Sequence, residues 1–361
     1  MFSPFPYDRI STQKTFFGRD EEMEVLTKTV KYSNNLLIYS KRRMGKSSLI
    51  DHFFETKKAD TLCIYVDIFD ITSKEDFAKS LLHGVSNATK GDLKSAIKKL
   101  TSLFKRVRVE PTIDPTTFEY SIKPIVVTLS FEEMMEDFFY TIRELSKESQ
   151  VIIAIDEFQQ IATITDVKLD AMLRKEMQQR ENISYLFLGS KRHLLTSLFE
   201  YRAPLYEMAT HYELQPLKFE AIQNYVAQYL KIDEEQLRSI CEITKYETKM
   251  MQNVFHLLWL QKEEMLTKEQ IDDIVREIIN SKDSSYKIIF DTLNNNQKIA
   301  LKVIGRYKNG FFTQTVLQEF NIKKQTLQSA LDALFKRELI DKDGDYYFIP
   351  DRTLELWVER L

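Results

Sequence analysis

The chain is poor in the residues that stabilise disulfide-rich and metal-stapled folds. Its 361 residues include only two cysteines, Cys63 and Cys241, too few for a disulfide framework or a zinc cluster. Both lie in apolar segments, which predicts buried free thiols. Five scattered histidines show no metal-ligand spacing. Because there are only eight glycines, each is a candidate for a position where the backbone needs a residue without a side chain.

Long apolar runs and a large excess of one charge are also missing. No stretch approaches the roughly 18 apolar residues of a membrane-spanning helix. The segment 1–7 has neither the basic nor the apolar region of a secretory signal. A formal net charge of −3 gives no overall attraction to nucleic acid or to an anionic membrane. These absences predict a soluble protein of the reducing cytoplasm without membrane contact.

Short apolar runs alternate with amphipathic stretches as far as residue 215. The runs are nearly continuous in apolar character, as is typical of strands buried on both faces of a parallel sheet. The predicted strands are Leu36–Tyr39, Cys63–Ile68, Val151–Ile155 and Tyr185–Leu188, with His211–Leu214 as a candidate fifth. The helices predicted between them include Ser47–Thr56, Ser73–Val85, Phe131–Ser146 and Val167–Arg180. This alternation predicts an α/β core with crossover connections.

One segment, Val107–Lys123, interrupts the alternation. Its prolines and alternating apolar residues predict a β-hairpin or an extended excursion. Basic residues precede it: Lys98, Lys99, Lys105, Arg106 and Arg108. They belong either to a solvated helix face or to a surface that docks a partner.

The chain changes character after Pro216. Helical patterns follow one another over Phe219–Leu230, Asp233–Thr244, Thr248–Leu266 and Lys268–Ile279, which predicts a small helical bundle. Three further helices and an Asp343-Gly344 hairpin turn predict a C-terminal winged helix. The predicted domains are therefore 1–215, 216–285 and 286–361.

The segment between the first predicted strand and the next helix has the pattern of a phosphate-binding P-loop. Backbone N–H groups of such a loop and of the helix that follows surround phosphate groups. The lysine of Gly45-Lys46-Ser47 reaches the β- and γ-phosphates, and the serine hydroxyl is a ligand for Mg²⁺. The predicted nucleotide contacts are Ser40, Lys41, Arg42, Arg43, Met44, Gly45, Lys46, Ser47 and Ser48.

Two acids and a serine complete the predicted site. Asp156 and Glu157 end the apolar run Val151–Ile155, so their carboxylates face the cleft beyond the carboxyl edge of the sheet. Asp156 is predicted to hold Mg²⁺, directly or through a water molecule, and Glu157 is the predicted general base that orients the attacking water. Ser190 follows the next strand and is predicted to contact the γ-phosphate or that water.

Four segments, in this order, resemble the archaeal-type ATPase family, a group of AAA+/STAND-like P-loop proteins that also has bacterial members. Phe16–Met23 resembles its FxGRxxEl box, Ser40–Ser48 its GPRRxGKTS loop, Asp156–Gln159 its DEfQ Walker B motif, and Gly189-Ser190 its sensor-1 segment. The resemblance implies an AAA+-like core, a helical lid, a winged helix and ATP as the nucleotide. It also implies that Gly18 and Arg19 shape the base pocket, whereas the residues alone predict a turn and a helix cap there.

Three departures from the family pattern bear on the rate of hydrolysis. Ser40 replaces the first glycine of the loop, and Thr244–Gln252 replaces a tgGhPyylq segment of the lid. Glu207-Met208 stand where the family has Gly-Arg, so that candidate arginine finger is missing. Arg192 and Arg202 are the candidates to replace it. Because such an arginine contributes ~10³-fold or more to the rate, the resemblance implies slow or partner-dependent hydrolysis.

Three functions remain open from the sequence. The first is a Mg²⁺-dependent ATPase whose conformational cycle acts on an unknown protein partner. The second is a nucleotide-loaded switch or scaffold with negligible turnover. The third is a DNA-binding regulator that uses the winged helix. Residues 291–361 hold 11 lysines and arginines against 10 acids, and the wing around Gly344 is acidic, so DNA is possible but not favoured.

Overall fold

The structure is a computed structural model that describes residues 3–57, 61–88, 99–113, 120–126, 129–179, 182–190, 192–261, 266–307, 309–344 and 346–361. The chain divides into two compact units. The core unit comprises Arg19–Lys41 and Lys46–Gln215, and the helical unit comprises Met1–Gly18, Arg42–Gly45 and Pro216–Leu361. The division of the chain into three domains stays a prediction.

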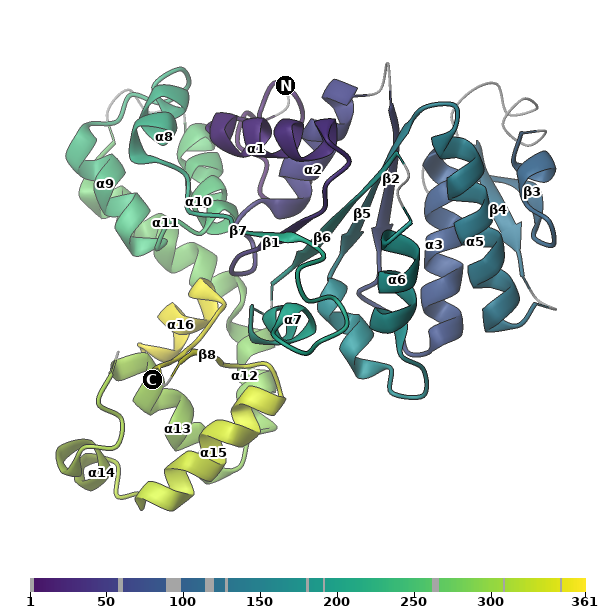
Figure 1. The fold of residues 1–361 in the computed structure, drawn as a ribbon. Helices are drawn as coiled ribbons and strands as arrows, with labels where there is room; N and C mark the ends of the chain where they lie inside the picture. Colours follow the sequence, from purple (N-terminus) through teal and green to yellow (C-terminus); the bar gives the residue numbers. More distant parts are fainter. Residues whose placement is uncertain are drawn as a thin grey trace. The chain divides into compact units, whose positions relative to one another are not determined.

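The core unit is built on a five-stranded parallel sheet, which confirms the predicted α/β class (Figure 1). The strands are β1 (Leu36–Tyr39), β2 (Thr61–Asp67), β5 (Gln150–Asp156), β6 (Ile183–Gly189) and β7 (Thr210–Glu213), in the order β2-β5-β6-β1-β7. Every residue of β6 is buried, as the continuous apolar run predicts. Because β1 and β5 both border β6, their carboxyl ends lie at one edge of the sheet.

Helices cover the sheet. They are α1 (Asp20–Lys31), α2 (Lys46–Lys57), α3 (Lys74–Ala88), α5 (Phe131–Ser146), α6 (Leu169–Met177) and α7 (Arg192–Phe199), with the 3₁₀ helix η1 (Phe158–Thr163). Of these, α3, α5, α6, α7 and η1 share one apolar core with the sheet. In Figure 1, α3 and α5 lie side by side next to β2. A capping box of Ser130 and Glu133 begins α5 and satisfies its first N–H groups.

The predicted hairpin is present as the antiparallel strands β3 (Arg108–Ile113) and β4 (Tyr120–Ile125). Its entry is fixed by the buried Asp137 of α5, which accepts hydrogen bonds from the N–H groups of Arg106 and Val107 at 2.7 and 2.8 Å. Arg106 also pairs with Glu136 at 2.8 Å, and Lys99 with Glu148 at 2.7 Å. These basic side chains therefore have acidic partners within the unit, which favours the solvated face over a docking surface; Lys98 lies outside the described residues.

The helical unit contains the bundle and the winged helix. The bundle helices are α8 (Phe219–Val226), α9 (Glu234–Ile243), α10 (Thr248–Gln261) and α11 (Lys268–Ser281). The winged helix follows with α12 (Asp283–Asp291), α13 (Asn295–Arg306), α14 (Gln314–Glu319), α15 (Lys324–Lys336), the strands β8 (Asp341–Asp343) and β9 (Tyr346–Phe348), and α16 (Arg352–Val358). Sequence patterns did not indicate α12 and α16 as separate helices.

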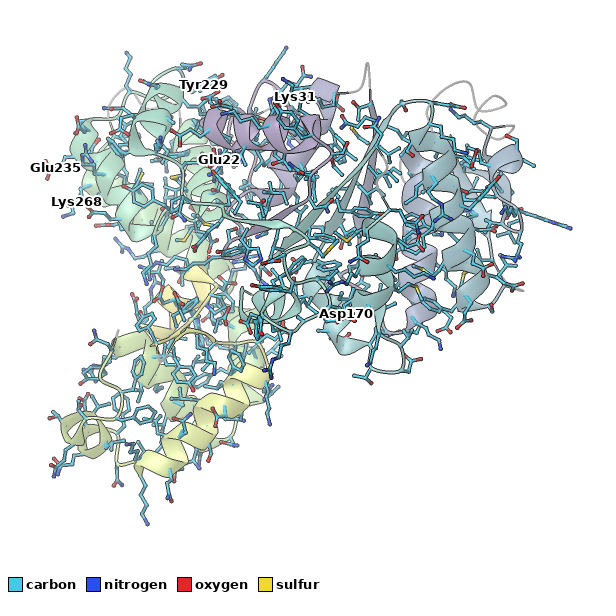
Figure 2. All side chains as sticks on the ribbon, in the orientation of Figure 1. Glu22, Lys31, Asp170, Tyr229, Glu235 and Lys268 are labelled. Carbon is cyan, nitrogen blue, oxygen red and sulfur yellow. The ribbon has the colours of Figure 1, made fainter. Side chains whose placement is uncertain are left out.

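The N-terminal segment packs on the bundle. The ring of Phe5 is fully buried and lies 6.0 Å from Tyr225 and 5.7 Å from Tyr229, which Figure 2 labels. The hydroxyl of Tyr225 donates to the carbonyl of Pro4 at 2.6 Å. Phe17 stacks on the same tyrosine with ring centroids 4.0 Å apart. These contacts fix the start of the chain to α8 and to the residues that follow it.

Candidate active site

The loop between β1 and α2 has a backbone suited to surrounding an anion. Positive φ angles occur at Arg43 (+65°) and Gly45 (+93°), and glycine is the residue that adopts this region without strain. Ser40 is not among the described residues with positive φ. Replacing the family's first loop glycine by serine is therefore compatible with the observed loop conformation. Its hydroxyl donates to the carbonyl of Lys41 at 2.9 Å.

Lys46 begins α2 with its ammonium inside this loop. The side chain is buried, and Nζ donates to Ser40 Oγ at 3.1 Å, to the Lys41 carbonyl at 3.2 Å and to the Ser40 carbonyl at 3.4 Å. A buried cation needs such oxygen partners, because an unpaired charge away from water is costly. The serine hydroxyl thus gives the lysine an acceptor that a glycine does not have.

Ser47 and Asp156, the two predicted metal ligands, are in contact. Ser47 Oγ donates to Asp156 Oδ2 at 2.9 Å, although the residues come from α2 and from the end of β5. The N–H of Glu157 donates to the other oxygen, Oδ1, at 2.8 Å. A hydroxyl and a carboxylate oxygen are hard ligands that Mg²⁺ accepts, with phosphate and water completing its shell. The pair therefore fits a magnesium ion.

Tyr65 is a site residue that the sequence did not reveal. Its hydroxyl donates to Asp156 Oδ2 at 2.5 Å. Burial is the main cause that raises the pKa of Tyr65, and the adjacent Asp156 carboxylate raises it further, so the hydroxyl stays a donor. β2 pairs with β5 so that Asp67 lies opposite Asp156 and Tyr65 opposite Ala154. The sequence signal that could have indicated its role is the spacing of Tyr65 and Asp67, which lie two residues apart and therefore on the same face of the strand.

Glu157 and Ser190 are brought together from the ends of β5 and β6. Ser190 Oγ donates to Glu157 Oε2 at 3.3 Å, and Gln159 Nε2 donates to the same oxygen. Glu157 has a φ of +54°, in the left-handed region. A non-glycine residue held there costs about 1–3 kcal/mol and persists only where its surroundings fix it. Strain of this kind concentrates at functional sites.

Negative charge gathers around these residues. Burial raises the pKa of Asp67, and the carboxylates of Asp156 and Glu157 raise it further against a hydrogen bond from the Phe69 N–H. In the described part of the chain, no group of three or more His, Cys, Asp or Glu side chains is arranged to hold a metal. A site of one carboxylate and one hydroxyl is consistent with that finding, because Mg²⁺ at a nucleotide takes most of its ligands from phosphate and water.

Comparison with protein families identifies the chain. Residues 16–246 match the family described as an ATPase domain predominantly from Archaea, a match that includes both the loop and the acidic strand end. The chain belongs to this family. Residues 284–360 match a probable winged helix domain. The resemblance predicted from the motifs is therefore confirmed, and the protein is an ATPase.

Solved structures share the fold of this ATPase over nearly its whole length. The Walker-type ATPase PABY2304 of Pyrococcus abyssi has a TM-score of 0.67 at 17% identity, with 99% of this chain and 100% of that chain covered. The Aeropyrum pernix ORC2 protein, solved as ADPNP-ADP complexes, has a TM-score of 0.57 at 14% identity over 99% and 96% of the two chains. The Aeropyrum pernix ORC1 protein, solved in complex with DNA, has a TM-score of 0.50 at 12% identity over 96% and 93%.

No curated protein matches the sequence of the ATPase. Among the described helices, none combines the length and the apolar character required to cross a bilayer.

Two arginines of the ATPase loop have acidic partners within the helical unit, to which Arg42–Gly45 belongs. Arg42 Nη2 lies 3.1 Å from Glu338 Oε2, and Arg43 Nη1 lies 2.8 Å from Asp351 Oδ1. The carbonyl of Arg43 accepts from the N–H of Lys249 at 3.2 Å, and that of Met44 from Thr248 Oγ1 at 3.3 Å. As nucleotide contacts, Arg42, Arg43 and Met44 stay predictions.

Gly18 and Arg19, the two residues predicted to lie beside the adenine base of the nucleotide, occupy different surroundings. Gly18 packs beside Ala221 of α8 in the helical unit. Arg19 is 4% exposed in the core unit, where Nη1 donates to the Gln215 carbonyl at 2.6 Å and to Glu22 Oε1 at 2.8 Å; Figure 2 labels Glu22. The arginine thus ties α1 to the segment after β7. A contact of either residue with adenine stays a prediction.

The fold assigns neither Arg192 nor Arg202 to the role of the missing arginine finger. The side chain of Arg192 lies outside the described residues. Arg202 is exposed, has a φ of +76°, and its guanidinium lies 5.4 Å from the ring centroid of Tyr201. These contacts assign it no acidic partner and no role in the site.

Glu247, which lies near Arg43 in the helical unit, makes the stability of the ATPase depend on pH. Burial raises the pKa of Glu247 to about 7 from 4.5, although Arg43 at 3.7 Å and the N–H of Arg352 both oppose the rise. The folded protein therefore binds more protons than the unfolded chain between pH 4.5 and 7, so stability is lost as the pH rises through that window. The loss amounts to about 3 kcal/mol.

Glu247→Gln is therefore expected to have a stability close to wild type at pH 4.5 and to be more stable at pH 8. Thermal unfolding followed by circular dichroism at both pH values checks this difference. Glu277→Gln, an exposed glutamate of α11, is the matched control and is expected to follow wild type at both. A lower Tm for Glu247→Gln at pH 8 would show that the ion pair with Arg43 outweighs the cost of burial.

Proposed function

We propose that this ATPase binds ATP with Mg²⁺ at the loop Ser40–Ser48 and hydrolyses it, with Glu157 as the general base. The observation that carries the proposal is the meeting of three pairs in one unit: Lys46 with the loop oxygens, Ser47 with Asp156, and Glu157 with Ser190. They come from the carboxyl ends of β1, β5 and β6 and from the start of α2, which follows β1. Ligands of open α/β sheets bind at this edge.

The magnesium ion would be held by Ser47 Oγ and Asp156 Oδ2, the two oxygens already in contact. When bound, it neutralises charge on the phosphate oxygens. Tyr65 supports this arrangement, because its hydrogen bond to Asp156 fixes the orientation of the carboxylate. A group that hydrogen-bonds a metal ligand increases the affinity for the metal, because it holds the ligand in place before the ion binds. In this proposal Tyr65 does this for Asp156.

The protein's own groups would divide the chemistry between them. Lys46 exchanges its contacts with the loop oxygens for phosphate oxygens and stabilises their charge. Glu157 accepts a proton from the water whose oxygen attacks the γ-phosphorus, while the bond from that phosphorus to the bridging oxygen breaks and ADP leaves with the oxygen. Ser190, which contacts Glu157, would report the presence of the γ-phosphate.

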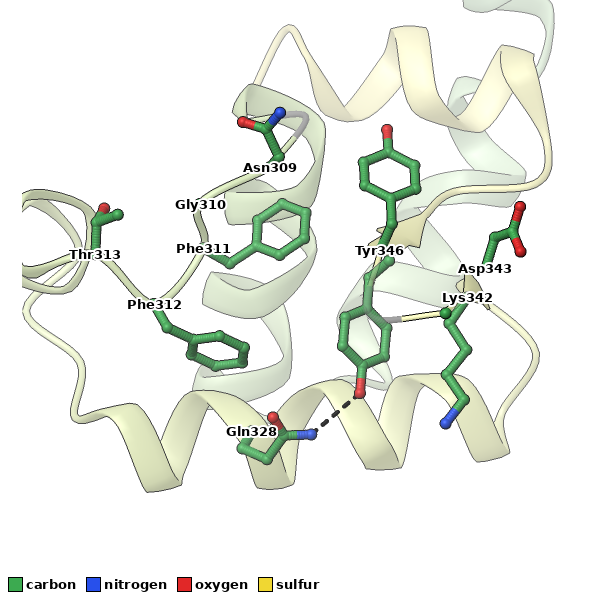
Figure 3. A pocket seen from close by; sticks show the side chains of 11 residues that line it. Asn309, Gly310, Phe311, Phe312, Thr313, Gln328, Lys342, Asp343 and Tyr346 are labelled. Carbon is green, nitrogen blue, oxygen red and sulfur yellow. Dashed lines mark hydrogen bonds between the residues drawn. The ribbon is translucent and has the colours of Figure 1, made fainter.

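We further propose that the ATPase cycle acts on a protein partner, with DNA as the less favoured alternative. The solved ORC1 relative is a complex with DNA, which keeps DNA open. The described surface of this winged helix instead has a groove of about 770 Å³ lined by Phe311, Phe312, Tyr346 and Tyr347 (Figure 3). Lys342 and Asp343 of β8 also line it, so the groove has no excess of positive charge that would attract phosphate. Apolar side chains of a protein suit such a lining better than a phosphate backbone does.

The test is ATP turnover by the purified protein in Mg²⁺ or in EDTA, each with and without duplex DNA at low salt. We expect slow turnover that requires Mg²⁺ and changes less than twofold with DNA. Turnover that persists in EDTA would contradict the metal assignment. Stimulation of tenfold or more by DNA would contradict the choice of partner. Nucleotide that stays bound and intact for hours in Mg²⁺ would instead support a switch with negligible turnover.

A further inference from the structure

Gln159 is a buried amide directed at the proposed base. It lies in η1 with 1% of its surface exposed, and its Nε2 donates to Glu157 Oε2. Its Oε1 has no hydrogen-bond partner in the described part of the chain. A buried, unpaired amide oxygen costs about 1–3 kcal/mol, so the orientation of this amide needs a compensating contact. The hydrogen bond to Glu157 is this compensating contact. A carboxylate only accepts hydrogen bonds, so the amide must turn its NH₂ group toward Glu157.

Ser190 donates to the same oxygen of Glu157. The Ser190 Oγ–Glu157 Oε2 distance is 3.3 Å, so Ser190 and Gln159 both donate to Oε2 of the carboxylate. Two donors on one oxygen fix the rotation of the carboxylate about its last bond. The other oxygen then points in a defined direction, which is what a general base needs to meet a water proton at hydrogen-bond distance.

Gly189 leaves the space in which the Gln159 amide sits. A Cβ built on Gly189 would lie 2.2 Å from Gln159 Oε1 and 2.6 Å from Leu195 Cδ1. Gly189 is not among the described glycines with positive φ, so the requirement here is for space and not for backbone conformation. The end of β6 thus serves the site twice: Gly189 makes room for the glutamine, and Ser190 supplies the second donor.

We propose that Gln159 is a positioning residue for ATP hydrolysis: with Ser190 it anchors one oxygen of Glu157, and Gly189 provides the space for it. The inference rests on the proposed function, because it assigns a role relative to Glu157 as base. Gln159 does not act on the nucleotide in this proposal. Its loss should therefore lower kcat and leave ATP affinity unchanged, because only the orientation of the base is affected.

Gln159→Ala tests the proposal by steady-state kcat and by the Kd of a fluorescent ATP analogue. We expect kcat to fall about 10- to 100-fold, part of the ~10²–10⁴-fold that a general base contributes, with Kd within about twofold. Gln160→Ala changes the next, half-buried residue of η1 and should match wild type in both. A thermal unfolding curve for each variant shows whether it is folded. Because kcat is expressed per nucleotide-binding site, unfolded protein does not count toward it, and a merely structural role of Gln159 would leave kcat unchanged.

A second pair of variants tests the part assigned to Gly189. Gly189→Ala should lower kcat as Gln159→Ala does, because the added methyl displaces the amide from Glu157. In the Gln159→Ala background the same change should lower kcat less than twofold further, since the close contact with Oε1 is then absent and the Leu195 side chain can move. Additive losses in the double variant would show that Gly189 acts through Leu195 and would overturn this part.

The outcomes separate the inference from the proposed function. If Glu157→Gln abolishes turnover while Gln159→Ala keeps kcat within twofold of wild type, Glu157 remains the base and the positioning role is wrong. If Glu157→Gln turns over like wild type, the part of the proposed function that makes Glu157 the base is wrong, and the inference that rests on it is wrong as well. A loss of ATP affinity in Gln159→Ala that matches its loss of kcat/KM would assign the glutamine to nucleotide binding instead.

Discussion

Glu157→Gln is expected to reduce ATP turnover at least about a hundredfold, because an amide cannot take a proton from the attacking water. The substitution keeps the size of the side chain and leaves an oxygen that can accept from Ser190, which donates to Glu157 in wild type. Lys46, Ser47 and Asp156 are unchanged, so the Kd for ATP should stay within about twofold. Steady-state phosphate release and a nucleotide-binding titration on the same preparation check both expectations.

Glu24→Gln is the matched control for this experiment. Glu24 is an exposed residue of α1 in the same unit, paired with Lys28 at 2.5 Å. It should leave kcat and Kd as in wild type. Turnover by Glu157→Gln within a few-fold of wild type would remove Glu157 from the mechanism and leave Asp156 as the remaining described acid in contact with Ser47.

Lys46→Ala is expected to weaken ATP binding by about a hundredfold or more, which is about 3 kcal/mol. The ammonium supplies charge-assisted hydrogen bonds to phosphate, and alanine has no group that can replace them. Removing it also takes a donor from Ser40 Oγ and one from the Lys41 carbonyl, which keeps its hydrogen bond from Ser40 Oγ. Equilibrium binding of a fluorescent ATP analogue measures the change.

Lys28→Ala removes an exposed lysine of α1 and should bind ATP as wild type does. An unfolding curve for Lys46→Ala distinguishes lost affinity from lost structure, since the substitution empties a buried position. A folded Lys46→Ala protein with ATP affinity close to wild type would contradict the assignment of Ser40–Ser48 as the phosphate-binding loop.

The elements that carry the site could be predicted because their signals are local. The strands β1, β5 and β6 are continuous apolar runs, and each one ends in the residues that matter for the site. The loop lies between a strand and a helix, and Asp156-Glu157 follow a buried strand directly. Chain order and topology then bring Ser47, Asp156 and Ser190 to one edge of the sheet, as expected.

The supporting contacts could not be predicted, because they depend on strand register and on partners far away in sequence. Tyr65 reaches Asp156 only because β2 pairs with β5 in the observed register. Gln159 was visible as part of a motif, yet its role requires the packing of its amide against Gly189. The acidic partners of Arg43 lie about 200 and 300 residues further along the chain, where local patterns give no signal.

A single-turnover experiment tests the central claim most directly. Wild-type protein in excess over radiolabelled ATP is mixed with Mg²⁺, quenched at intervals and assayed for ADP and free phosphate, with Glu157→Gln treated in parallel. The account predicts that wild type converts its bound ATP to ADP and phosphate, while Glu157→Gln binds the same amount and returns it as ATP. Intact ATP recovered from wild type after hours, or equal conversion by both proteins, would contradict it.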